Sequence, residues 1–181
     1  MSSLPESYEA RIHRAEVLAA ETLSPGMIRV VFGGEDLRDY PTTGVGDEYV
    51  RLFFPENPDE VPNLPIVSGR GWEFEDDVTP SEARVYTIRR HAPGEITVDL
   101  DVHAGGVAAQ WASQARPGQV VGINPPHGLY ERPETVTRQI LIADEPGLPA
   151  ALRIAEQTAA AVPTLLVLEV RGEENRLFAE A

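Results

Sequence analysis

The sequence contains no cysteine, no lysine and no long apolar run. Without cysteine, this chain can form no disulfide, no thiolate metal site and no iron–sulfur cluster, so any redox chemistry must come from a bound cofactor. All 15 basic residues are arginine, which also excludes lysine chemistry. No stretch approaches the roughly 18 apolar residues of a membrane span, so we expect no transmembrane helix.

Positive charge is scarce, because 29 acidic residues leave a net charge of −14 at pH 7. Such a charge repels nucleic acid and anionic membranes, so we expect neither as a partner. An anionic cofactor would need arginines gathered locally. The first residues lack the charged and apolar regions of a signal peptide, so we expect a cytoplasmic location.

Metal-binding and nucleophile patterns are also missing. The four histidines, His13, His91, His103 and His127, fall at spacings that match no metal-ligand pattern. The segment 67–71 lacks the glycine that precedes the serine of a nucleophile elbow by two residues. These patterns predict no metal ligand and no catalytic side chain.

The hydrophobic content of 42% is typical of a globular chain. Apolar and polar residues alternate between turn residues, and they predict strands at 27–32, 49–54, 84–90, 95–102 and 119–124. Residues 8–23 fit neither the helical nor the strand period, but a turn at 24–26 makes a hairpin with 27–32 plausible. Together they predict a six-stranded antiparallel barrel within residues 1–136. Residues 56–80 are rich in proline and aperiodic, so we expect a long surface excursion there.

A different pattern begins at Arg138, with an apolar strand at 138–143, a helical run at 148–161 and a second apolar strand at 164–170. Strand, helix and strand in this order predict a parallel β-α-β unit. The fold class is therefore mainly β, with a barrel at 1–136 and the start of an α/β nucleotide-binding domain at 137–181. Such a domain needs on the order of 100 residues. We expect the apolar runs of both strands to be covered by a second copy of the chain, a partner, or the barrel.

The strand at 84–90 carries an arginine, an aromatic ring and a hydroxyl close together. Arg84 and Tyr86 share one face, because alternate side chains of a strand point the same way. A guanidinium beside an aromatic ring suits a flat ligand with a phosphate. An ordinary barrel strand with a half-exposed arginine would look the same, and the stretch alone leaves both interpretations open.

Arg84-x-Tyr86-Thr87 resembles the Arg-x-Tyr-Ser/Thr flavin motif of the ferredoxin reductase superfamily. With Ile88 and Arg89 added, it is similar to the motif of the siderophore-interacting proteins, which are FAD-dependent ferric-siderophore reductases. The resemblance implies that Arg84 holds a flavin phosphate, that Tyr86 lies against the isoalloxazine and that Thr87 binds near its reactive nitrogen. Val85 is included in the implied FAD site.

A second motif opens the helix after the strand at 95–102. A glycine pair there lets a phosphate approach free backbone N–H groups, although a plain strand-to-helix turn is also compatible. The run 103–112 resembles the family's His-Gly-x-x-Gly-Pro-Ala-Ser-x-Trp-Ala, which implies an FAD site of Val102, His103, Gly106, Ala108, Ala109 and Trp111. The chain departs from the pattern at Ala104, at Val107, and at Ala109, which replaces a hydroxyl.

The turn at 143–150 resembles the family's Gly-Asp-Glu-Thr-Ala-Leu-Pro-Ala, the opening of its NAD(P)H domain. Asp144 and Glu145 are therefore implied cofactor-binding residues. Pro146 replaces the threonine, and His127 stands where the family has arginine.

Three hypotheses follow. In the first, the chain binds FAD, takes electrons from NAD(P)H as co-substrate and passes them to a ferric siderophore. In the second, a repurposed flavin-reductase scaffold binds a small molecule and catalyses a redox-neutral step, as the departures from the motifs suggest. In the third, the chain is an incomplete half of a split reductase. The sequence leaves all three open.

Overall fold

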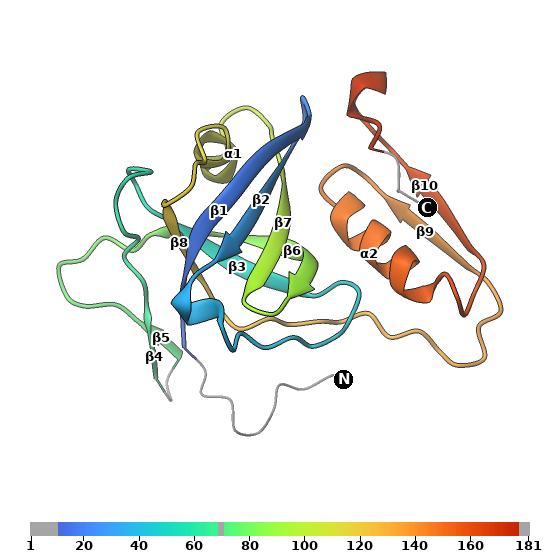
Figure 1. The fold of residues 1–181 in the computed structure, drawn as a ribbon, viewed down its shortest axis with the longest axis horizontal. Coiled ribbons are helices and arrows are strands. Elements are labelled where there is room, and N and C mark those ends of the chain that lie inside the picture. Colours follow the sequence, from blue (N-terminus) through green and yellow to red (C-terminus); the bar gives the residue numbers. More distant parts are fainter. Residues whose placement is uncertain (1–10, 69–70, 178–181) are drawn as a thin grey trace.

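The computed structural model describes residues 11–68 and 71–177 (Figure 1). The elements, in chain order, are β1 (His13–Ser24), β2 (Met27–Gly33), the 3₁₀ helix η1 (Glu35–Leu37), β3 (Tyr49–Phe54), β4 (Ile66–Ser68), β5 (Gly71–Glu73), β6 (Glu82–Ala92), β7 (Glu95–Asp101), α1 (Val107–Ala112), β8 (Val120–Ile123), β9 (Gln139–Ala143), α2 (Leu148–Thr158), β10 (Thr164–Leu168) and the 3₁₀ helix η2 (Glu173–Asn175).

Six strands form a closed barrel in the order β1-β2-β7-β6-β3-β8. Every neighbouring pair is antiparallel, which confirms the predicted six-stranded antiparallel barrel. The segment with no clear period is a strand from His13 onward, and it pairs with both β2 and β8.

The barrel interior is filled by the alternating apolar residues that predicted the strands, such as Val30, Phe32, Val98 and Leu100, all fully buried. Helix α1 packs on this core through Trp111, whose ring lies 6.1 Å from Phe32 and 5.3 Å from Phe54. The sequence predicts a helix at 107–115, and the observed helix is shorter, because it ends at Ala112. One edge of the core is therefore made by a helix that follows β7 after the loop 102–106.

The excursion between β3 and β6 contains a short hairpin, β4 and β5, where the sequence predicted no regular structure. Trp72 of β5 lies 5.2 Å from the ring of Phe53, and the guanidinium of Arg51 lies 5.3 Å from the Trp72 ring centroid. The hairpin is thus held to the barrel by aromatic and cation–π contacts.

Strands β9 and β10 form a parallel pair joined through α2, as the β-α-β pattern predicted. Helix α2 lies between this pair and the barrel (Figure 1). Four apolar side chains on the two strands are 46–78% exposed: Ile140, Ile142, Leu165 and Val167. We expected a second copy, a partner or the barrel to cover these side chains. Within the described residues, the barrel does not cover them.

Helix α2 is fixed to the barrel by arginines. Arg153 donates to the carboxylate of Glu48 at 2.8 Å and to the carbonyl oxygen of Ile88. From the other side, Arg89 of β6 donates twice to the carboxylate of Glu156. The α/β unit is therefore attached directly to β6, the strand that carries the arginine–tyrosine–threonine motif.

No helix in residues 11–68 and 71–177 combines the length and the apolar character needed to cross a membrane. The same residues contain no group of three or more metal-ligating side chains placed to hold an ion. The last barrel strand ends at Ile123 and β9 begins at Gln139, while the domain division at 136/137 stays a prediction.

Candidate functional site

The barrel has an open strand edge at the arginine–tyrosine–threonine motif. Strands β6 and β7 pair only from Ile88↔Val98 to Ala92↔Glu95. Residues Arg84 to Thr87 pair with β3 on one edge, while β7 runs on along β2 as far as Asp101. We call the other edge of residues 84–87 the β6 edge. Its backbone groups are available to a ligand, because β7 has diverged from it.

Arg84 is half-exposed and keeps its guanidinium at the surface. It donates to the Glu82 carboxylate at 2.6 Å and to the Ala83 carbonyl oxygen at 2.9 Å. Both charged side chains are about half exposed, at 49% and 57%. An ion pair of this kind is weak in water, so a phosphate that brings a higher charge can displace Glu82 from Arg84.

Tyr86 is partly buried and belongs to an aromatic chain. Its ring meets Phe54 edge-on at 6.5 Å, and Phe54 in turn contacts Trp111. Burial, with a smaller contribution from the Asp101 carboxylate, raises the pKa of Tyr86 to about 12. The phenol therefore stays protonated at neutral pH and acts as a hydrogen-bond donor and an apolar face, and not as a base.

Thr87 is half-buried and Val85 is exposed, and both lie on the β6 edge beside Tyr86. The four residues predicted from this motif are therefore adjacent on one strand that is paired on one side only.

The residues of the second motif follow the end of β7. His103 is exposed, and a Cβ added at Gly106 would lie only 2.7 Å from its ring. Glycine at this position therefore lets the imidazole fold over the start of α1. Ala108 and Ala109 are buried at 3% and 4%, so neither methyl group is exposed to a ligand.

Trp111 is 2% exposed, and its indole nitrogen has no hydrogen-bond partner among the described residues. The indole ring packs in the hydrophobic core, so the role that the structure shows for Trp111 is structural.

A cavity of about 420 Å³ separates α1 from the segments before β4 and before β6. Its walls include Glu82 at the start of β6, Val107 and Gln110 of α1, and the aromatic pair Phe54 and Trp111. The start of β6, two residues before the β6 edge, and the first turn of α1 therefore border one hollow. The sequence did not reveal this cavity, because its other walls come from an aperiodic loop.

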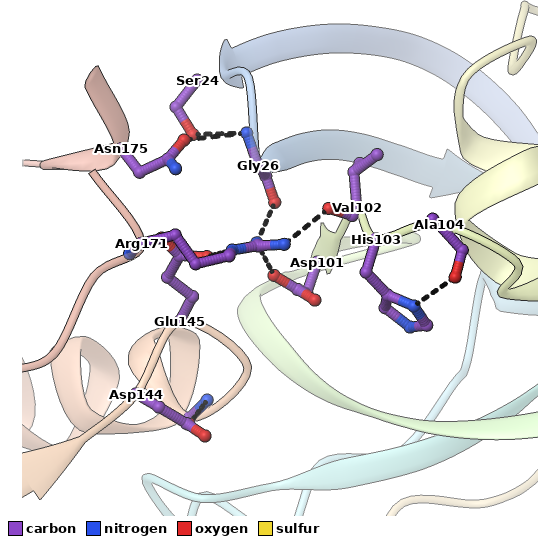
Figure 2. A network of polar contacts seen from close by, with 11 residues as sticks. Ser24, Gly26, Asp101, Val102, His103, Ala104, Asp144, Glu145, Arg171 and Asn175 are labelled. Carbon is purple, nitrogen blue, oxygen red and sulfur yellow. Dashed lines mark hydrogen bonds and ion pairs between the residues drawn. The ribbon is translucent and has the colours of Figure 1, made fainter. Parts of the chain in front are cut away.

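Asp144 and Glu145 lie at the turn between β9 and α2 (Figure 2). Asp144 accepts from the Gly147 amide at 3.0 Å. Glu145 is buried and receives both the backbone N–H and the guanidinium of Arg171. Arg171 also reaches Asp101, so this turn touches the end of β7 through one side chain.

The structure thus brings two of the three predicted groups together, on the β6 edge and at the end of β7. It connects the third group to them through Arg171. Neither Arg171 nor Asp101 was predicted. Asp101 lies on the polar face of an alternating strand, and Arg171 lies in a polar segment with no motif, so nothing in their spacing marked them.

The arrangement suits a flat, phosphate-bearing cofactor. It offers a surface guanidinium, a partly buried aromatic ring, an unpaired strand edge and an α1 start with no side-chain cap. It offers no close pair of titratable groups for acid–base chemistry on the β6 edge. The residues therefore fit a role in holding a cofactor.

Residues 16–130 match the family model described as the siderophore-interacting FAD-binding domain. A curated relative from Escherichia coli (strain K12), named NADPH-dependent ferric-chelate reductase, is 33% identical over 148 residues, which are 82% of this chain and 58% of that protein.

Among solved structures, a siderophore utilization protein from T. fusca superposes with a TM-score of 0.82 at 28% identity, over 99% of this chain and 68% of the other. The siderophore-interacting protein SipS from Aeromonas hydrophila gives a TM-score of 0.73 at 22% identity, over 94% of this chain and 64% of the other, and it supports the fold. The chain spans 58% of the length of the Escherichia coli relative and 60% of the length of a second curated relative, from Mycobacterium bovis.

Proposed function

The chain belongs to the siderophore-interacting FAD-binding family, and we propose that it is the flavin-carrying part of an oxidoreductase that reduces ferric siderophores. The observation that carries the proposal is the β6 edge, where β7 leaves β6 and exposes Arg84 to Thr87 beside the end of β7. An aromatic ring, a guanidinium and free backbone groups meet there, and each suits a different part of FAD.

Arg84 holds a phosphate of the cofactor, Tyr86 supplies the apolar face for the ring system, and Thr87 supplies a hydroxyl beside it. Val85 and Val102 offer backbone groups on the two sides, and His103 and Gly106 lead into α1. The cofactor supplies the hydride and electron chemistry, whereas the chain binds it, orients it and sets its electrostatic surroundings.

The first experiment measures FAD uptake. We expect the purified chain to bind added FAD, as followed by flavin absorbance after gel filtration and by quenching of flavin fluorescence. A protein that takes up no FAD would refute the proposal.

Arg84→Ala should weaken FAD binding about tenfold, because a charged hydrogen bond contributes roughly 1.5–3 kcal/mol and the pair with Glu82 offsets part of it. Tyr86→Phe keeps the ring and should cost less. Arg90→Ala is the matched control, since Arg90 is also exposed and on β6 but lies beyond the β6 edge. Equal effects of Arg84→Ala and Arg90→Ala would place the phosphate elsewhere.

We also propose NAD(P)H as the electron donor and a ferric siderophore as the acceptor. Asp144 and Glu145, at the end of β9, would lie on the nicotinamide side, because ligands of parallel sheets bind beyond the carboxyl ends of the strands. Two strands supply only part of such a crevice, so we expect slow flavin reduction by NAD(P)H in this chain. Stopped-flow absorbance measures it, and rapid turnover with a ferric chelate would contradict the expectation.

A second candidate function is supported by two observations. The Glu82 carboxylate already pairs with the Arg84 guanidinium, and Ala109 stands where the family motif has a residue with a hydroxyl group. Both weaken a phosphate site, as expected for a scaffold that binds another small molecule and performs a redox-neutral step. Absence of FAD uptake together with a thermal shift by other small molecules would favour this function.

The exposed face of Ile140, Ile142, Leu165 and Val167 supports a further proposal, that a second copy of the chain or a separate partner covers the parallel pair, as in a split reductase. The solution mass tests it. We expect a mass above that of the monomer, and Ile142→Glu should reduce it to the monomer value.

A further inference from the structure

Arg171 makes more polar contacts than any other side chain shown in Figure 2. Its guanidinium donates to the Asp101 carboxylate at 2.5 Å, to the Val102 carbonyl oxygen at 2.9 Å and to the Gly26 carbonyl oxygen at 3.5 Å. It also donates to Glu145. One cation from the segment after β10 therefore touches the end of β7 and the turn before α2.

The end of β7 is where Arg171 meets the proposed flavin site. Asp101 is the last residue of β7, and Val102 follows it into the loop that leads to α1. The Asp101 side chain is only 12% exposed. Its negative charge acts on Tyr86 of the β6 edge, where it adds to the effect of burial in raising the pKa of that side chain.

Burial and three neighbouring charged or titratable side chains act on the pKa of Asp101. Burial raises the pKa of Asp101, Arg171 opposes that effect, Glu145 adds to it and His103 opposes it. Glu145 is 5% exposed and carries a second carboxylate beside the same guanidinium. Without Arg171, two largely buried carboxylates would face each other next to the loop of the flavin site.

We propose that Arg171 is a positioning residue that sets the charge beside the bound flavin, and that it raises the reduction potential of FAD by neutralising Asp101 and Glu145. The inference rests on the proposed function. Reduction by two electrons and one proton adds one negative charge to the flavin, and the electrons come from the nicotinamide or from an added reductant. A cation beside Val102 favours that charge, whereas two unpaired carboxylates oppose it.

The test measures the potential of FAD bound to the full chain, by reduction with dithionite in equilibrium with a reference dye. Arg171→Gln should bind FAD with a more negative potential than the wild type. Arg171→Lys keeps the charge and should retain most of the wild-type potential. Asp101→Asn should shift the potential in the opposite direction, because it removes a negative charge from the same site.

Arg176→Gln is the matched control. Arg176 also lies after β10, is exposed and pairs only weakly with Glu173, at 3.4 Å. Its removal changes the net charge of the chain by the same amount as Arg171→Gln, so it should leave the potential unchanged.

Three results would overturn the inference. They are an unchanged potential in Arg171→Gln, equal shifts in Arg171→Gln and Arg171→Lys, or equal shifts in Arg171→Gln and Arg176→Gln. The second would mean that shape and not charge matters, and the third would mean that only the net charge matters. A wild-type chain that binds no FAD would refute the proposed function itself, whereas bound FAD with an unchanged potential in Arg171→Gln refutes this inference alone.

Discussion

Removal of the buried cation on α2 should loosen the α/β unit from the barrel. Glu48 is fully buried, and Arg153, which is 6% exposed, donates to it at 2.8 Å. Breaking a buried ion pair by removing one partner costs about 3–5 kcal/mol, because the other charge remains buried. For Arg153→Met we expect the free energy of unfolding to fall by about 3 kcal/mol, the lower end of that range, since Thr42 and Thr43 still donate to Glu48.

The assay is urea unfolding at pH 7, followed by tryptophan fluorescence and by far-ultraviolet circular dichroism. Both tryptophans lie outside the α/β unit, so fluorescence reports on the barrel and its hairpin, while circular dichroism also reports on α2. With a slope of about 2 kcal/mol per molar urea, the midpoint should fall by roughly 1.5 M.

Two further variants make the test of Arg153 specific. Glu48→Gln with Arg153→Met removes both charges and should recover much of the loss. Arg38→Met breaks an exposed pair with Glu35, in which both side chains are more than two thirds exposed, and should shift the midpoint little. A midpoint in Arg153→Met within about 0.3 M of the wild type, a fifth of the expected shift, would refute the reasoning.

Two other outcomes are expected. In the flavin-free chain, one of the five tyrosines should titrate at about pH 12 in absorbance at 295 nm, and Tyr86→Phe should remove that phase. The pKa of Tyr86 in the folded chain is raised above its usual value of 10.0. The contribution of Tyr86 to stability is therefore present below about pH 10 and is lost as the pH rises through about 12. A tyrosine titration that is complete by about pH 10.5 would contradict this. Gly46→Ala should lower stability by about 1–3 kcal/mol, because its Cβ would lie 2.6 Å from Cγ1 and 3.0 Å from Cα of Ile154 on α2. A smaller penalty in an Ile154→Ala background would identify that contact as the cause, and an unchanged penalty would exclude it.

The barrel could be predicted because most of its strands bury one face. Strand β7 shows why: Ile96, Val98 and Leu100 are buried and alternate with more polar residues. Strand β1 could not be assigned because the alternation stops halfway, and Leu18 to Thr22 are all exposed. Its pairing depends on partners at residues 27–33 and 120–123, which no local pattern contains.

The short hairpin β4 and β5 was missed for a related reason. Each strand has three residues and pairs only with the other, so neither is long enough to show a period. What holds the hairpin is the contact of Trp72 with Phe53 and Arg51, and those residues lie about 20 positions earlier in the sequence.

The residues of the β6 edge could be singled out because they are consecutive, so a local motif contains them all, whereas the divergence of β7 that leaves this edge unpaired was not predicted. The charges around it were not predicted, because Asp101 and Arg171 lie 70 residues apart and meet only in the folded chain. Long-range ion pairs leave no periodic trace in a sequence with 15 arginines and 29 acidic residues.

Both sides of the candidate site are held by arginines that involve the α/β unit. Arg153 of α2 donates to the carbonyl oxygen of Ile88, the residue after Thr87, while Arg171 donates to the carbonyl oxygen of Val102. A guanidinium can serve both roles because its five donors reach a carboxylate and a backbone oxygen at once. The distance between the β6 edge and the end of β7 therefore depends on how the α/β unit sits on the barrel. A shift of α2 would therefore act on the proposed flavin site through the Ile88 carbonyl group, and a shift of the segment after β10 would act on it through the Val102 carbonyl group.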